Sequence, residues 1–310
     1  MQPAPFYSDV SNAPTGGKVF WRTTSDGVRI RLGAWTQGRK GTVLLFTGRT
    51  EFIEKYGGTV RDFAELGYAT ITLDWRGQGL SDRALKDRST GHVHNFLDYQ
   101  NDVAALVTSA RELNMPRPFF LLSHSMGGAI GLRALHNGLD VRAAVFSAPM
   151  WGILISPMVR PFAKILAAVS GVVGLRHLYA PGTGPKTYVD IAPYDDNLLT
   201  TDREMYDMMQ HQVRSHPDLA LGGPSLGWLH EALSETHKLS RMPSPDKPAI
   251  TFLGTNERIV DTKSVVDRMQ RWPNGRLDII PGAEHEVLME TPGTRAHVYK
   301  LTDALFSENT

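Results

Sequence analysis

The chain has 310 residues, a formal net charge of +1, 41% hydrophobic and 21% charged residues, and no cysteine. This length and composition predict a globular protein with one large α/β domain, or one such domain that carries an insertion. The near-neutral charge and the lack of a Lys/Arg-rich stretch argue against electrostatic binding of nucleic acid, and the absence of cysteine excludes a disulfide framework, a thiolate metal site and a cysteine nucleophile.

The first seventeen residues are rich in Pro, Ser and Gly. They lack the basic start and the apolar core of a signal peptide, so we expect a cytoplasmic location. Two strand-like runs follow, at 19–24 and 28–35, and they flank Asp26-Gly27. Asp-Gly between two such runs predicts a β-hairpin.

Further along the chain, apolar runs typical of buried strands alternate with amphipathic runs typical of helices. Strands are predicted at 42–47, 69–73, 119–122, 143–146, 249–253 and 276–280, and helices at 54–66, 95–113, 126–137, 262–271 and 294–306. This alternation predicts an α/β fold with a mostly parallel sheet and helices on both of its faces.

Residues 150–235 interrupt the alternation, because they contain helix-like stretches and no clear core strand. We expect a core in two parts, 1–149 and 236–310, with 150–235 inserted as a helical cap over the carboxyl ends of the strands. The most apolar part of this insertion, 151–175, is interrupted by Arg160, Lys164 and several Pro and Gly residues, which argues against a membrane span. It is predicted as a buried or amphipathic cap helix, with transient contact with a lipid surface as the alternative.

A nucleophile elbow is indicated by the sequence SHSMGG at 123–128, directly after the strand predicted at 119–122. Small residues around Ser125 allow a sharp turn from strand to helix, which exposes the hydroxyl of this serine at the helix N-terminus. The first glycine of the G-x-S-x-G pattern is replaced here by Ser123. Ser125 is therefore the predicted nucleophile, with a slightly more crowded turn.

A serine nucleophile needs a basic histidine and a carboxylate that orients it, and in this strand arrangement both follow the serine in the chain. His285 lies in the loop after the last predicted strand and is the predicted base. Two carboxylates follow the strand at 249–253, and of these Glu257 is predicted as the acid. Asp261 is interpreted as a structural cap of the next helix.

The developing oxyanion requires two backbone donors. One is expected from the residue after the nucleophile, Met126, and the other from Arg49 in the loop after the strand at 42–47. His124 is expected to pack beneath the elbow, and His92 to line the mouth of the site or to cap a nearby helix. Asp74 is interpreted as part of a turn scaffold.

Together these residues resemble the serine α/β-hydrolases of the lysophospholipase and monoacylglycerol lipase group, from about residue 19 to 306. The resemblance implies an eight-stranded core, a helical cap over a lipid-sized pocket, and hydrolysis of an acyl ester by Ser125, Glu257 and His285. The sequence departs from the family pattern at Ser123 and at Thr47-Gly48-Arg49, where a His-Gly pair is usual. The motifs that carry the resemblance are TGRTE at 47–51, DWRGQGLS at 74–81, HSMGG at 124–128, GTNER at 254–258 and GAEH at 282–285, and GGPSLGW at 222–228 resembles the lysophospholipase L2 branch.

Other functions remain open on the same fold. A proline-aminopeptidase-type peptidase would need an acidic anchor for a substrate amine, and Asp195, Asp196, Glu204 and Asp207 do not settle whether the cap provides one. A non-catalytic ligand receptor is the non-enzyme alternative. A dehalogenase or an epoxide hydrolase would carry aspartate in place of Ser125. No cofactor, metal or nucleic acid is implied, the expected partner is a small acyl ester, and the sequence does not indicate the oligomeric state.

Overall fold

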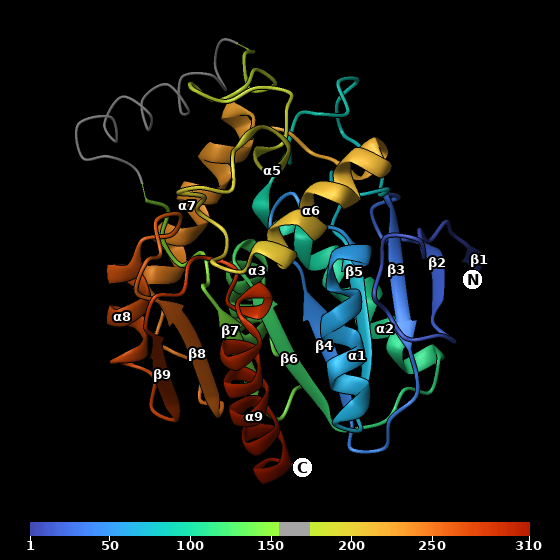
Figure 1. The fold of residues 1–310 in the computed structure, drawn as a ribbon, viewed down its shortest axis with the longest axis vertical. Helices are drawn as coiled ribbons and strands as arrows, with labels where there is room; N and C mark the ends of the chain where they lie inside the picture. Colours follow the sequence, from blue (N-terminus) through green and yellow to red (C-terminus); the bar gives the residue numbers. More distant parts are fainter. Residues whose placement is uncertain (155–173) are drawn as a thin grey trace.

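The computed structural model describes residues 1–154 and 174–310. It arranges them around one nine-stranded sheet with the order β1-β2-β3-β5-β4-β6-β7-β8-β9 (Figure 1). Strands β4 to β9 run parallel, while β1, β2 and β3 add an antiparallel edge. The strands are β1 (Gln2–Pro3), β2 (Lys18–Thr23), β3 (Arg29–Trp35), β4 (Thr42–Phe46), β5 (Ala69–Asp74), β6 (Phe119–His124), β7 (Ala144–Ser147), β8 (Ala249–Gly254) and β9 (Gly275–Ile280).

The predicted α/β-hydrolase fold with a mostly parallel sheet is confirmed. Every strand expected from the apolar runs is present, and β2 and β3 form the hairpin predicted around Asp26-Gly27. The sheet has one strand more than the eight implied by the family resemblance, because Gln2–Pro3 pairs with the outer edge of β2. This two-residue strand lies far along the sheet from the strands that end at the site described below.

Side chains of the central strands alternate between two cores. Val43 and Leu45 of β4 pack on one face of the sheet together with α1 and α9, whereas Leu44 and Phe46 pack on the other with α2, α3 and α8. Both faces are thus covered, as the continuous apolar runs predict. The helices are α1 (Gly57–Glu65), α2 (Tyr99–Glu112), α3 (Met126–His136), α8 (Thr262–Met269) and α9 (Pro292–Glu308), with 3₁₀ turns at η1 (Ile53–Tyr56), η2 (Phe96–Asp98) and η4 (Val287–Met289).

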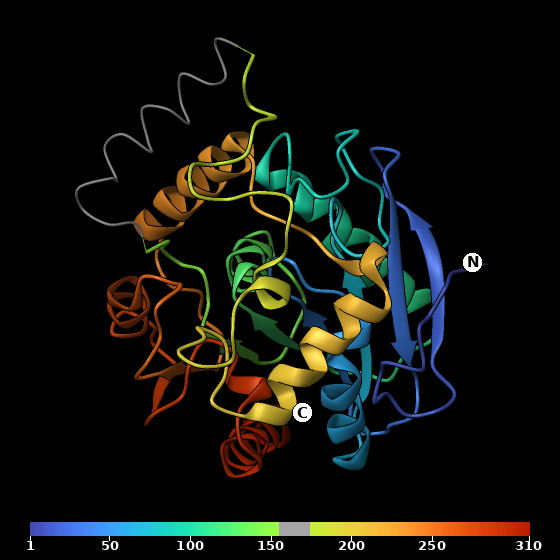
Figure 2. The same cartoon turned by 45° about the horizontal axis from the view of Figure 1, so that its top comes forward.

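The described part of the segment between β7 and β8 lies over the carboxyl ends of the parallel strands (Figure 1). Its described part holds α5 (Tyr188–Ile191), α6 (Arg203–Ser215), η3 (Pro217–Leu219) and α7 (Leu226–Arg241), and it adds no strand to the sheet. Figure 2 shows α5 between the longer helices α6 and α7. The predicted boundary at residue 235 falls within α7. We keep the name cap for residues 150–235.

Most of the apolar run predicted as a cap helix, residues 155–173, lies outside the described residues. Within the described part of the chain, no helix is both long enough and apolar enough to span a membrane.

Candidate active site

Three loops at the carboxyl ends of the parallel strands bring Ser125, His285 and Glu257 together. Ser125 follows β6, Glu257 follows β8, and His285 lies between β9 and η4. The Oγ of Ser125 lies 2.9 Å from Nε2 of His285, whose Nδ1 lies 2.6 Å from Oε2 of Glu257. All three residues are buried. The predicted nucleophile, base and acid therefore form one continuous hydrogen-bonded chain.

The backbone at Ser125 adopts a left-handed conformation with φ of 51° and ψ of −118°. A non-glycine residue in this region is strained, and such strain is typical of a nucleophile held on a sharp strand-to-helix turn. The turn is tight: a Cβ at Gly127 would lie 2.4 Å from the carbonyl oxygen of Phe46. Ser123 fits because it faces Gly131 of α3, where an added Cβ would lie 3.3 Å from its Oγ.

Glu257 and Asp261 have separate structural roles. The Oε1 of Glu257 accepts hydrogen bonds from the backbone N–H groups of Ile259, at 2.6 Å, and Val260, at 3.0 Å, which leaves Oε2 for His285. Burial acts to raise the pKa of Glu257, but the hydrogen bond to His285, the charge of that histidine and the two backbone N–H donors together outweigh it, and the pKa is lowered. Asp261 caps α8 by accepting from the N–H of Lys263, as predicted.

The loop after β4 holds the second predicted oxyanion donor. Gln78 clamps this loop, since its Oε1 accepts from the N–H of Thr50 at 2.8 Å and its Nε2 donates to the carbonyl of Gly48 at 3.1 Å. The N–H groups of Arg49 and Met126 donate to no described residue. Both are therefore available to a ligand.

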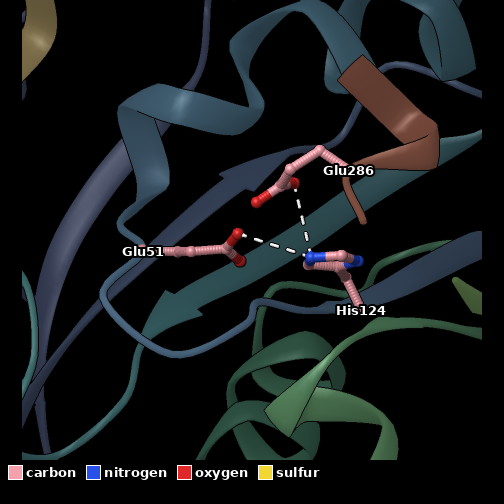
Figure 3. Close-up of side chains that lie close together, drawn as sticks. All are labelled: Glu51, His124 and Glu286. Atoms are coloured by element: carbon pink, nitrogen blue, oxygen red, sulfur yellow. Dashed lines mark ion pairs between the residues drawn. The ribbon is translucent and has the colours of Figure 1, made fainter. Parts of the chain in front are cut away.

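A buried cluster of charged side chains lies beside the serine and the histidine, since His124 precedes Ser125 and its ring centroid lies 4.7 Å from that of His285. Figure 3 shows three of its members, Glu51, His124 and Glu286. Nε2 of His124 lies 3.3 Å from Oε2 of Glu286 and 3.7 Å from Oε1 of Glu51. Lys55 bridges the same two carboxylates, with Nζ 2.5 Å from Glu51 and 2.6 Å from Glu286. The hydroxyl of Tyr56 donates to Glu51 at 2.6 Å. We call Glu51, Lys55, Tyr56, His124 and Glu286 the charge cluster.

The charge cluster is electrically balanced when His124 is protonated on both nitrogens. Its Nδ1 lies 3.1 Å from the carbonyl oxygen of Ser147, and its Nε2 faces only carboxylates. Burial acts to lower the pKa of His124, but Glu286 and Glu51 outweigh it and the pKa is raised. Burial acts to raise the pKa of Glu286, yet Lys55 and His124 hold it well below its usual range.

The donor set of Glu51, His124 and Glu286 has the spacing of a metal site. The ammonium group of Lys55 already lies between the two carboxylates and supplies the positive charge that a cation would bring. We therefore interpret the set as part of an internal ion cluster. Sequence reasoning placed His124 beneath the elbow but missed the cluster, since Glu286 is far from Glu51 in sequence.

A cavity of about 490 Å³ opens from Ser125 and His285 between the core and the cap. Its size is typical of a small-molecule site. Most of its wall is apolar, and both the core and the cap contribute to it. The apolar lining residues include Phe52, Met150, Ile153, Val213, Trp228, Leu229 and Ile259.

Two further residues singled out in the sequence have structural roles. The Nδ1 of His92 lies 2.8 Å from the hydroxyl of Ser225, which caps α7. Asp74 holds the turn after β5 through the N–H of Leu80, at 2.8 Å, and pairs with the buried Arg31 at 2.7 Å.

Comparisons with known proteins show what the chain is similar to. Residues 37–292 match the family described as serine aminopeptidase, S33. The chain is 30% identical to the probable lysophospholipase L2 of Haemophilus influenzae, over 83% of this chain and 81% of that protein. It is also 30% identical to lysophospholipase L2 of Escherichia coli, over 89% of this chain and 86% of that protein. A soluble variant of monoglyceride lipase from Saccharomyces cerevisiae, solved with a substrate analog, has the same fold, with a TM-score of 0.75, 20% identity and 99% of each chain covered.

Proposed function

Since the chain belongs to the serine aminopeptidase S33 family, we propose that it is a serine hydrolase that cleaves lipid-like acyl esters, such as lysophospholipids or monoacylglycerols, through an acyl-enzyme. The observation that carries this proposal is the continuous chain from Ser125 through His285 to Glu257, with the nucleophile on a strained turn. The catalytic residues are Ser125, His285 and Glu257, and the oxyanion donors are the N–H groups of Arg49 and Met126.

In the proposed reaction, Ser125 Oγ attacks the ester carbonyl while Nε2 of His285 takes the hydroxyl proton. The carbonyl oxygen becomes an oxyanion, which accepts hydrogen bonds from the N–H groups of Arg49 and Met126. His285 then passes the proton to the departing alcohol, which leaves an acyl ester on Ser125. Water, deprotonated by the same histidine, hydrolyses this ester and restores the serine. Glu257 fixes the imidazole tautomer throughout.

The test is Ser125→Ala, assayed on p-nitrophenyl esters and by labelling with a fluorophosphonate. We expect loss of both turnover and labelling, because the variant lacks the nucleophile. Ser109→Ala is a matched control, since the Ser109 hydroxyl is buried in α2, where it donates to the carbonyl of Ala105. Turnover or labelling that persists in Ser125→Ala would contradict the proposal, and a wild-type protein without turnover would favour the receptor alternative.

Lipid-like esters are favoured over aminoacyl substrates by the charges in the cavity. Within the described residues, the carboxylates that line it are Glu51 and Glu286, and both are paired with Lys55. The segment 155–173 contains no Asp or Glu. The cavity therefore lacks an unpaired carboxylate that could anchor a substrate amine. We expect cleavage of monoacylglycerols and none of aminoacyl-naphthylamides; the reverse profile would establish the peptidase alternative.

The cap is also the part of the described surface that favours transient contact with lipid. Of eight exposed large apolar side chains, five lie on it. We expect that replacing Leu154 and Leu178 by serine weakens sedimentation with phosphatidylcholine vesicles, while Leu97→Ser, an exposed leucine of the core, does not. Equal sedimentation of all three proteins would contradict a contact made by the cap. The five exposed apolar side chains of the cap are those of Leu154, Leu175, Leu178, Tyr188 and Ile191.

A further inference from the structure

The side chain of Arg49 extends into the wall of the cavity from the loop between β4 and η1, which we call the oxyanion loop. Its Nη2 donates to the carbonyl of Gly222 at 2.6 Å, and its guanidinium carbon lies 5.2 Å from the centre of the Trp228 ring. Gly222 and Trp228 belong to the cap and also line the cavity. The guanidinium is therefore held between the oxyanion loop and the cap, beside the space that a substrate enters.

No described carboxylate neutralises this guanidinium, and the segment 155–173 contains none. Its Nε is buried and has no hydrogen-bond partner among the described residues. Two buried arginines differ from the half-buried Arg49: Arg31 contacts Glu54 and Asp74, and Arg76 contacts Asp26 and Asp102. The buried Arg268 has no carboxylate partner, but its guanidinium donates to three backbone carbonyls. A buried donor without an acceptor costs free energy, so an unpaired buried Nε indicates a site for a ligand with acceptor oxygens.

The charge on Arg49 persists at neutral pH. Burial lowers the pKa of Arg49 to about 10, which still leaves the group protonated under physiological conditions. The other charges that line the cavity do not neutralise it: Glu51 and Glu286 belong to the balanced charge cluster, and Lys186 is a second cation, exposed at the surface. The cavity therefore carries a net positive charge next to the oxyanion loop.

We propose that the Arg49 guanidinium binds the phosphodiester of a lysophospholipid whose ester carbonyl occupies the oxyanion hole. This assignment rests on the proposed function and refines its substrate class from acyl esters in general to esters of phosphorylated glycerol. A guanidinium is suited to phosphate oxygens because its N–H donors form a planar fork. The backbone N–H of Arg49 binds the carbonyl oxygen, and the glycerol spacer between carbonyl and phosphorus has about the reach of an arginine side chain.

The competing interpretation is that Arg49 only holds the cap against the core through Gly222. The two roles differ in their effect on substrates. A lost cap contact lowers activity on every ester in similar proportion, whereas a lost anion contact lowers activity only on substrates that carry the phosphate. The ratio of kcat/KM for two substrates with the same acyl chain separates the roles.

The experiment measures kcat/KM for lysophosphatidylcholine and for monoacylglycerol of the same chain length, both in nonionic detergent micelles. In Arg49→Met we expect the ratio of the first to the second to fall about tenfold to a hundredfold, the range for a hydrogen bond to a charged group. Arg49→Lys keeps the positive charge but loses the planar fork of N–H donors. We expect its kcat/KM ratio to lie between those of the wild-type protein and Arg49→Met. Lys186→Met is the matched control and is expected to change the ratio less than Arg49→Met, because Lys186 is exposed and screened.

A second measurement needs no variant. We expect glycerophosphocholine to inhibit p-nitrophenyl butyrate hydrolysis by the wild-type protein at concentrations where glycerol does not. Equal inhibition by the two compounds, or an unchanged ratio in Arg49→Met, would overturn the assignment. In either case Ser125-dependent turnover would still stand, so failure of this inference is distinguishable from failure of the proposed function.

Discussion

At the scale of single residues, the two carboxylates that follow β8 have separate tasks. Glu257 is bonded to His285 and Asp261 to the first turn of α8. We expect Glu257→Gln to lower kcat about 10³- to 10⁴-fold, because the amide no longer holds the reactive tautomer and cannot stabilise the imidazolium. Asp261→Asn is the control and should have little effect, since asparagine also caps helices. The measurement is steady-state kinetics of both variants. A larger loss of kcat in Asp261→Asn than in Glu257→Gln would identify Asp261 as the acid.

His124 predicts a pH-dependent stability. Its folded-state pKa is raised, so its contribution is complete below the ordinary histidine pKa and is lost as pH rises through the raised value. Glu286 has a lowered pKa, so its contribution is present above the ordinary carboxyl pKa and is lost as pH falls through the lowered value. The cluster is therefore most stabilising between the ordinary pKa values of a carboxyl group and a histidine, where Lys55, whose pKa is raised, is also charged.

The measurement is urea unfolding of the wild-type protein and of His124→Gln from about pH 5 to pH 9. We expect the difference in free energy of unfolding between the two proteins to be largest at the acidic end and to shrink as pH rises. Groups outside the charge cluster titrate equally in both proteins and cancel in the difference. A difference that is constant with pH would show that folding does not shift the pKa of His124, and a difference that grows as pH rises would show that His124 is uncharged in the folded protein.

The residue scale also shows what the sequence could predict. The order of Ser125, Glu257 and His285 along the chain, each after a predicted strand, was enough to identify the hydrogen-bonded chain that the structure contains. The partners of His124 could not be found in this way, because Glu51 and Glu286 reach it from loops far apart in sequence. The fit of Ser123 was also hidden, since it depends on Gly131, which lies in the next helix, α3.

At the scale of elements, the charge cluster joins two loops of the site to the end of a strand. Glu51 comes from the loop after β4, His124 ends β6, and Glu286 follows His285. Glu51 also accepts a hydrogen bond from the N–H of Gly48, which ties its carboxylate to the backbone of the loop that holds Arg49. The cluster thus fixes the positions of the loops relative to one another.

Lys55 is the central cation of this arrangement. Lys55→Met leaves two carboxylates buried with only His124 to balance them, and we expect a loss of about 3–5 kcal/mol in the free energy of unfolding. The matched control is Lys263→Met, which removes an exposed i,i+4 pair with Asp267 and should change stability little. Urea denaturation of Lys55→Met and Lys263→Met compares the two effects. Equal unfolding midpoints would mean that the buried ion pairs contribute no more to stability than the surface pair does.

The individual helices of the cap were not predicted, because packing rather than pattern decides where they lie. The strands of the core are continuous apolar runs and were predictable, but the cap has no period that fixes how its helices sit. Its contacts explain the difference: the N–H of Glu286 donates to the carbonyl of Leu199 at 2.7 Å, and Arg258 pairs with Asp196 at 2.7 Å. These contacts join loop residues that are far apart in sequence, so the position of the cap cannot be recognised from the local sequence.

At the scale of the whole molecule, the N-terminal segment joins the core to the cap. The ring of Tyr7 stacks on the ring of His216 at the end of α6, with centroids 3.7 Å apart. The backbone N–H of Tyr7 donates to Glu54 of η1 at 3.1 Å. The carbonyl of Val10 accepts from Gln212 of α6 at 2.9 Å. This segment, which is rich in Pro, Ser and Gly, therefore lies between η1 and α6 and connects two parts of the chain that bound the cavity.

Tyr7→Ala tests this connection. We expect a loss of about 2 kcal/mol in the free energy of unfolding, from the aromatic stack and the hydroxyl bond to Asp218. Amide exchange is expected to quicken in both η1 and α6, because both elements lose a shared support. Tyr194→Ala is the matched control: Tyr194 packs on Tyr206 and bonds to the carbonyl of Thr201, all within the cap, so exchange should quicken in α6 and not in η1. Unchanged exchange of η1 in Tyr7→Ala would mean that the core holds this turn without the N-terminal segment.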